Sequence, residues 1–472
     1  MGEKISLQNN TKGMIREFIV DSSLSPLDSS ELTLNLHTDA IGSLTLRKGL
    51  TLLGATIGSN PVLGITLYRN NSGTIYQILA MVGSNVYVFD GISWSSVRSG
   101  LTNESTAHFT NLVDYIFMVN GNGNQALATY GGSGSFGTTN AASLPAGDFI
   151  ENYRSRIWVA DNSDDKIYYS DVVTTSNTIT GGTAFIQISP QDGEKIRGIK
   201  RHPRGLLVFK ENHIYRIFSI NSTDPDPSIH RGTYSNASII EYKAGIFYHH
   251  PTGFYKFIFD GEQQEISRPI ADILQAIPRS YYEKVSGWSD DDHIYWSIGD
   301  ITLKGITYTN IVCCQTLSTQ NWTVYSYASE IRSSGLYDNG SDIHTPIVGD
   351  NIGNVLLFGT GTTDNGTPIF YDLQTHWYTL SRLKSTRKSF TELATIHENA
   401  QGANISYRLD VDSGNKWNPI SSITKNLEQI DKINAKNFVR IRFRLSGSHI
   451  GDPFIFRTWE MLNVIVEGEI KK

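Results

Sequence analysis

Cysteine is almost absent from this chain of 472 residues, which has only two, Cys313 and Cys314, side by side. Neighbouring residues of a strand point to opposite faces, so this pair predicts neither a disulfide nor a metal clip. The fold must therefore be held together by its apolar core, for which 39% hydrophobic residues provide ample material.

Long apolar runs are also lacking. No 18 apolar residues follow one another, and residues 1–9 contain no apolar segment of signal-peptide length. We therefore expect synthesis in the cytoplasm without membrane insertion, which disfavours a periplasmic or cell-surface protein.

An excess of positive charge is missing as well. The chain has 40 Lys+Arg against 46 Asp+Glu, a net charge of −6. Proteins that bind the phosphate backbone need a basic field, so the composition argues against a protein that reads a DNA sequence.

Catalytic and metal-binding motifs are not apparent. There is no Gly-x-Ser-x-Gly elbow and no phosphate-cradling glycine loop. The carboxylates of residues 164–165 and 290–292 lie in predicted hairpin turns, where Asp is typically solvated, and His249 and His250 diverge on a strand. Residues 161–165 lack the glycine and distal glutamate of a calcium loop, which leaves at most a weak structural ion. We predict no enzymatic activity, no cofactor and no metal centre.

Strands dominate what is present. The best helical segment, residues 270–277, has two turns and stops at Pro278. Elsewhere an apolar strand, a short polar turn and a strand rich in Tyr, Phe and Ile recur, as in residues 78–91 and 205–218. This pattern predicts an all-β fold built from hairpins.

The spacing of these hairpins predicts a β-propeller. Successive aromatic strands begin at Val86, Ala126, Ile167, Ile214, Phe254, Ile294 and Val355, at intervals of 40, 41, 47, 40, 40 and 61 residues. Propeller blades repeat at about 40 to 50 residues. The longest interval contains an extra hairpin, residues 306–325, that would allow a further blade, so we expect six to eight blades and favour seven. Trp94, Trp322 and Trp377 each follow a turn, and such residues can wedge between blades.

The two ends of the chain differ from the repeats. After residue 381 the strands alternate strictly, and residues 439–445 place Arg440, Arg442 and Arg444 on one face. We predict an extended N-terminal arm over 1–42, a propeller over 43–381 and a C-terminal β-sandwich over 382–472. Residues 44–53 would form a strand pair that joins the last blade and closes the ring. Residues 1–381 have a net charge of −11 and residues 382–472 of +5.

The arrangement of the parts resembles the β-propeller tail hub or nozzle proteins of short-tailed bacteriophages, including the packaged-DNA stabilisation proteins. The resembling stretches are residues 42–50, 153–160 before 166–171, and 196–199 before 206–216.

The resemblance implies a virion tail protein in six copies, docked beneath the portal and adaptor rings and beside tail fibre or needle proteins. Such a ring retains the genomic DNA and then lets it pass without sequence-specific binding. An acidic lumen would repel phosphate over about 8 to 10 Å at physiological salt. Arg440, Arg442 and Arg444 would then meet an acidic neighbour at an interface, although a solvated outer face also explains them.

A carbohydrate-binding or carbohydrate-cleaving propeller, such as a phage receptor-binding protein, is the alternative. Exposed Trp158, Trp296 and Trp377 would stack on sugars in that case. Glycan binding by the isolated protein, against assembly into rings with tail proteins, separates the two hypotheses.

Overall fold

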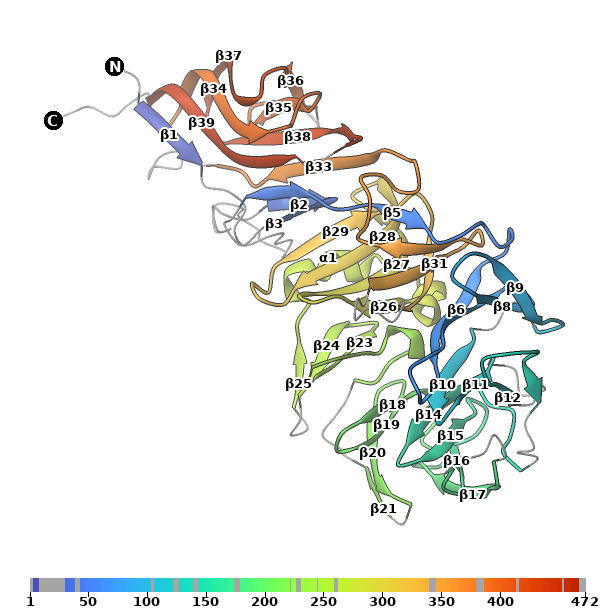
Figure 1. Ribbon diagram of the computed structural model, residues 1–472. Coiled ribbons are helices and arrows are strands. Elements are labelled where there is room, and N and C mark those ends of the chain that lie inside the picture. The colour runs from blue at the N-terminus through green and yellow to red at the C-terminus, as the bar shows by residue number, and fades with distance from the viewer. Residues whose placement is uncertain are drawn as a thin grey trace.

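The computed structural model describes residues 3–7, 30–38, 43–102, 106–121, 127–138, 143–173, 179–220, 222–225, 231–243, 245–258, 262–338, 345–378, 386–412, 416–451 and 454–466. These residues form an all-β molecule with two parts, a β-propeller and a β-sandwich (Figure 1). The fold class predicted from the sequence is confirmed.

The propeller has seven four-stranded blades, the favoured number. Blade 1 is β6 (Val62–Arg69), β7 (Tyr76–Val82), β8 (Asn85–Phe89) and β9 (Trp94–Arg98). Blade 2 is β10 (His108–Leu112), β11 (Tyr115–Val119), β12 (Ala128–Tyr130) and β13 (Gly137–Thr138). Blade 3 is β14 (Phe149–Tyr153), β15 (Arg156–Ala160), β16 (Lys166–Ser170) and β17 (Gly181–Gln187). Blade 4 is β18 (Ile196–His202), β19 (Gly205–Lys210), β20 (Ile214–Ser219) and β21 (Ser222–Pro225).

The remaining three blades complete the ring. Blade 5 is β22 (Ile240–Tyr242), β23 (Gly245–His250), β24 (Gly253–Phe257) and β25 (Gln263–Glu265). Blade 6 is β26 (Ser286–Ser289), β27 (His293–Leu303), β28 (Ile306–Thr316) and β29 (Trp322–Ser326). Blade 7 is β30 (Ile331–Tyr337), β31 (Thr345–Asp350), β32 (Val355–Phe358) and β5 (Leu50–Leu52). The described helical turns lie near blades 5 and 6: η2 (Asn236–Ser238), η3 (Arg268–Ile270), α1 (Ala271–Gln275) and η4 (Arg279–Lys284).

The first strand of each blade is innermost, and β30 of blade 7 packs against β6 of blade 1, which closes the circle. A blade cannot bury both of its faces alone, so apolar side chains of neighbouring blades pack together. Indole groups join them, because Trp94 Nε1 donates to Leu53 O beside blade 7 at 3.0 Å, and Trp322 Nε1 donates to Ile266 O after blade 5 at 3.0 Å. The predicted wedging is confirmed for these two residues.

The described residues of the long interval between Ile294 and Val355 form no eighth blade. Ile294 lies on β27, and the extra hairpin predicted there is β28 and β29, the outer half of blade 6. Two strands of eleven residues lengthen this blade, and sequence spacing cannot distinguish longer strands from additional ones. Ala126, which was used for the spacing, lies outside the described residues.

The ring is closed by β5, which pairs antiparallel with β32. Only the second half of the predicted strand pair does this, because β4 (Leu44–Leu46) belongs to the sandwich. Between β4 and β5 lies Arg47, which is 3% exposed and forms hydrogen bonds of 2.8 and 2.6 Å with the carboxylate of Asp364. Its guanidinium also lies over the ring of Tyr327, 3.9 Å from the centroid. These contacts anchor the closing strand.

The sandwich draws its strands from both ends of the chain. They are β1 (Glu3–Leu7), β2 (Ser30–Leu34), β3 (Leu36–Thr38), β4, β33 (Ile369–Thr375), β34 (Lys388–Glu398), β35 (Asn404–Leu409), β36 (Asn418–Ser422), β37 (Leu427–Phe438), β38 (Ile441–His449) and β39 (Ile455–Val466). One sheet has the order β3-β4-β39-β34-β37, with β1 beside β39, and the other continues blade 6 in the order β29-β2-β33-β38-β35-β36. Figure 1 shows β2 and β3 between the two parts.

This topology corrects the predicted boundaries. Strands of the arm over 1–42 pair with C-terminal strands, and the sandwich includes β33, which precedes residue 382. The change of pattern after residue 381 marks only where the longest sandwich strands begin, because a strand's own sequence does not reveal which sheet it joins.

Candidate functional site

Arg440, Arg442 and Arg444, here called the arginine stripe, lie along the face of β38 that is turned toward blade 6. Arg442 and Arg444 share one face of this strand, and Arg440 directly precedes it. Arg442 lies over two indole rings, 5.0 Å from the centroid of Trp377 and 4.7 Å from that of Trp417. Arg440 lies over Trp377 at 5.5 Å and Arg444 over Trp417 at 5.9 Å. The three predicted residues are thus brought together around two tryptophans, of which the sequence singled out only Trp377.

Two of these arginines form close ion pairs within the chain. Arg442 Nη1 lies 2.7 Å from Glu31 Oε2 of β2, and Arg444 donates to both carboxylate oxygens of Asp372 at 2.8 and 2.9 Å. Arg442 is 9% exposed, so the alternative of a solvated outer face is wrong for this residue. Arg440 is 41% exposed and 3.8 Å from Asp410, and the predicted interface role depends chiefly on it.

The ion pairs and burial shift the pKa values of Arg442 and Arg444 in opposite directions. Burial lowers the pKa of Arg442, and the nearby Glu31 carboxylate opposes this effect. Burial also disfavours the charged form of Arg444, but its hydrogen bonds to Asp372 outweigh the burial and raise its pKa. An arginine side chain stays charged in proteins, so both are cations.

A cleft of about 650 Å³ lies between this face and the long β27–β28 hairpin. Phe370, Asp372 and Gln374 alternate along β33 and form its floor beside Arg442 and Arg444. Ile306 and Tyr308 of the hairpin form the opposite wall. Glu31 joins the two sides, because it also accepts a hydrogen bond of 2.8 Å from Lys304 of the hairpin.

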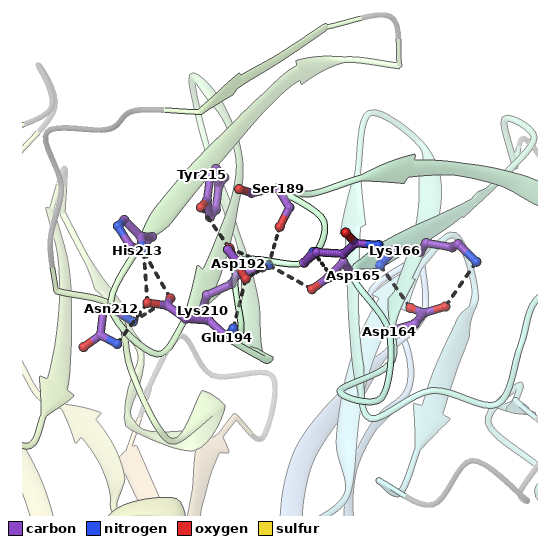
Figure 2. Close-up of polar contacts among 11 residues, drawn as sticks. Asp164, Asp165, Lys166, Ser189, Asp192, Glu194, Lys210, Asn212, His213 and Tyr215 are labelled. Atoms are coloured by element: carbon purple, nitrogen blue, oxygen red, sulfur yellow. Dashed lines mark hydrogen bonds and ion pairs between the residues drawn. The ribbon is translucent and has the colours of Figure 1, made fainter.

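A second polar cluster connects blades 3 and 4 (Figure 2). Lys210 has a fully buried side chain, and its Nζ donates to Asp165 Oδ1 at 2.8 Å, to both oxygens of Asp192 at 2.8 Å, and to Ser189 O at 3.1 Å. Asp165 was expected to be a solvated turn residue, and this expectation is wrong, because its side chain is 22% exposed and paired. Neighbouring Glu194 accepts hydrogen bonds from Asn212. The carboxylates of Asp165 and Asp192 both form ion pairs with Lys210, which is typical of a structural ion-pair network.

The axis of the propeller contains a small cavity of about 320 Å³, lined by the innermost strands. Asn236 Nδ2 donates to His108 Nδ1 at 3.0 Å and thereby links η2 to blade 2. Burial lowers the pKa of His108 to about 4, with a further contribution from Lys200, so the ring is neutral near pH 7 and accepts this bond.

The remaining candidates are core or turn residues. Trp158 and Trp296 are 1% and 0% exposed, so the expectation that they are available to sugars is wrong. Burial lowers the pKa of His249 to about 3, and both its ring nitrogens are buried without a hydrogen-bond partner among the described residues. Asp290 accepts hydrogen bonds from His293 and Tyr295 within blade 6. The two cysteines are buried and free.

Among the residues with described positions, no group of three or more His, Cys, Asp or Glu side chains could hold a metal ion. The described helices include none that is long and apolar enough to cross a membrane.

Comparison with protein-family models and with curated proteins finds no match. Similar solved structures include two of the extracellular domain of a one-component or hybrid two-component system from B. thetaiotaomicron, 12% and 13% identical, with TM-scores of 0.44 and 0.45. The matches cover 90% and 86% of this chain but only 62% of each of those chains. The CNH domain of AfRom2 is 10% identical with a TM-score of 0.39, over 66% of this chain and 98% of that one. Likeness at this level says nothing about the activity of the chain.

Proposed function

We propose that this chain is a structural tail hub or nozzle protein of a short-tailed bacteriophage virion, present in six copies. The resemblance in sequence suggests the class, and the separation of charge between the two parts of the fold carries the argument. Along the observed boundary, residues 49–368 have 20 Lys+Arg and 29 Asp+Glu, a net charge of −9. Residues 1–48 and 369–472 together have 20 and 17, a net charge of +3.

The path of the DNA would lie between the subunits of the ring. The hydrogen bond between Asn236 and His108 joins opposite sides of the axial cavity of about 320 Å³, so a DNA duplex could not pass through this cavity. The acidic propellers would instead face a shared lumen. Repulsion of phosphate over roughly a Debye length of 8 to 10 Å would keep the DNA from sticking to the wall.

The sandwich, which carries the net positive charge, would serve assembly. Positive potential on the sandwich favours docking against an acidic neighbour, which in a tail would be the portal or adaptor ring or a fibre or needle protein. In this role the protein needs no catalysis and no cofactor, and it would reside in the virion tail after synthesis in the host cytoplasm.

Mass measurement and imaging test the proposal. Mass photometry of the purified protein, alone and mixed with the portal and adaptor proteins of its virion, should detect rings of six copies. Cryo-electron microscopy of the virion should place these rings beneath the portal, with the propellers around the lumen. A monomer at this position, or a protein outside the tail, would refute the hub.

A further inference from the structure

The cleft between the sandwich and the β27–β28 hairpin has the size and walls of a ligand site. Its volume of about 650 Å³ falls within the roughly 300 to 1,000 Å³ of small-molecule pockets. The floor is one continuous sheet, in which Gln374 of β33 pairs with Arg444 of β38, and Arg442 with Arg408 of β35. Side chains on such a sheet are held in place by their neighbours, so the site is preformed.

Positive charge prevails in this cleft. Its lining has four cations, Lys304, Arg408, Arg442 and Arg444, against the two carboxylates Glu31 and Asp372. Arg442 is nine-tenths buried, and its Nε has no hydrogen-bond partner among the described residues. Four cations against two carboxylates leave the lining with a net positive charge, which an anionic ligand would balance. The cleft therefore favours a ligand with an anionic group.

The other lining residues suit a ligand with an apolar face and many hydroxyls. Phe370 is 46% exposed on the floor and offers a flat ring, and Tyr308 contributes a second aromatic wall. Thr307 and Gln374 add neutral hydrogen-bonding groups. Glu31 and Asp372 can accept hydrogen bonds from hydroxyl groups, which a saccharide has in number and a polyphosphate lacks.

We propose that this cleft binds an anionic saccharide, with the ring of Phe370 against the apolar face of a sugar and Arg442 beside the acidic group. The acidic group is a carboxylate or a phosphate carried by the sugar, because a guanidinium recognises either. Trp377 and Trp417 support this site, since the guanidinium group of Arg442 lies over both of their rings.

Titration calorimetry with the full chain tests this site. The probes are tetragalacturonate, which carries carboxylates, pentamannose 6-phosphate, which carries a phosphate, neutral galactotetraose, and tripolyphosphate. We expect at least one acidic saccharide to bind with a Kd about tenfold or more below that of galactotetraose and of tripolyphosphate. Added salt should weaken this binding, because the cleft is open to solvent.

Two exposed phenylalanines provide a matched pair of variants. Phe370→Ala should weaken binding of the acidic saccharide about tenfold, because the stacking surface is lost. Phe185→Ala is the control, since Phe185 is also 46% exposed but lies on blade 3. Arg442→Lys, which keeps the charge but removes the planar guanidinium, should weaken binding too. A melting curve will check its fold.

Three results would overturn the site: no binding of either acidic saccharide, equal binding of tripolyphosphate, or wild-type affinity in the Phe370→Ala protein. The inference is independent of the hub proposal. A sixfold ring whose subunits bind no acidic saccharide would refute only the proposed saccharide site. A monomer in the virion that binds an acidic saccharide would refute only the proposed tail hub.

Discussion

Lys210 is the clearest case of a single residue that determines local structure. A buried ammonium is unfavourable unless it is paired, and here two carboxylates and a carbonyl oxygen surround it (Figure 2). Burial lowers the pKa of Lys210, but its bonds to Asp165 and Asp192 outweigh the burial and raise it. Burial correspondingly raises the pKa of Asp192, but Lys210 and the Glu194 backbone N–H outweigh this effect and lower it below the usual 3.8. The residue therefore joins blades 3 and 4 through charge.

We predict that Lys210→Met lowers the free energy of unfolding by about 2 kcal/mol at pH 7, because the two carboxylates lose their cation while keeping partial access to water. The lowered pKa of Asp192 stabilises the fold above pH 4, and this contribution is lost as the pH falls through the folded-state value. The difference between variant and wild type should therefore shrink below pH 4. Urea unfolding at pH 3 and pH 7 measures it, with exposed Lys195→Met as the control. An equal difference at both pH values would indicate lost packing instead.

Among the elements, β5 is short but lies where the two ends of the propeller meet. Its three residues complete blade 7 and thereby connect the two ends of the propeller. Leu50 is 3% exposed and packs in one apolar cluster with Leu356 and Phe358 of β32. Without this strand, β32 would be an unpaired edge, and blade 7 would lack the strand that continues along the chain into blade 1.

Leu50→Ala should cost about 3 kcal/mol of stability, since it leaves a cavity where the closing strand meets β32. Hydrogen exchange should accelerate first in β5 and β32, ahead of blades 3 and 4. Leu336→Ala is the matched control, because this leucine of blade 7 is 47% exposed, and its replacement should change stability by less than about 0.5 kcal/mol. Equal acceleration in all blades would show that the propeller opens as one unit and that opening does not start at β5.

In the whole molecule, a shared sheet joins the acidic propeller to the sandwich, which has a net positive charge. Blade 6 continues into the sandwich because β29 pairs with β2, and Glu31 of β2 bonds to cations on both sides. These links favour movement of the two parts as one body. A hub would need this rigidity to hold its propellers around a lumen.

For the assembled ring we predict that Arg440→Gln weakens subunit or adaptor association several-fold and makes it less dependent on salt, because an exposed charge contributes to docking. Arg442 and Arg444 are unsuitable for this test, since their loss would break ion pairs inside the chain. Arg457→Gln serves as the control, because Arg457 is 44% exposed on β39 of the other sheet. Mass photometry at low and high salt gives the comparison. Unchanged assembly of the Arg440→Gln protein would remove this residue from the interface.

The sequence by itself determined the all-β class and the propeller repeat, with six to eight blades expected, and it located the closing strand within residues 44–53. These features are local, because alternating apolar residues and short polar turns define each hairpin, and the hairpins recur along the chain. It also placed Arg440, Arg442 and Arg444 on one face, which follows from the period of a strand.

Only the tertiary structure decided which partners these side chains have. Glu31 and Arg442 are 411 residues apart in the chain, and Trp417 and Asp372 carry no pattern that links them to the stripe. Membership of β2, β3 and β33 in the sandwich was decided in the same way. The physical reason is that strand pairing and charge pairing depend on distance in space, and a strand's sequence specifies its faces but not the strand or charge that lies beside it.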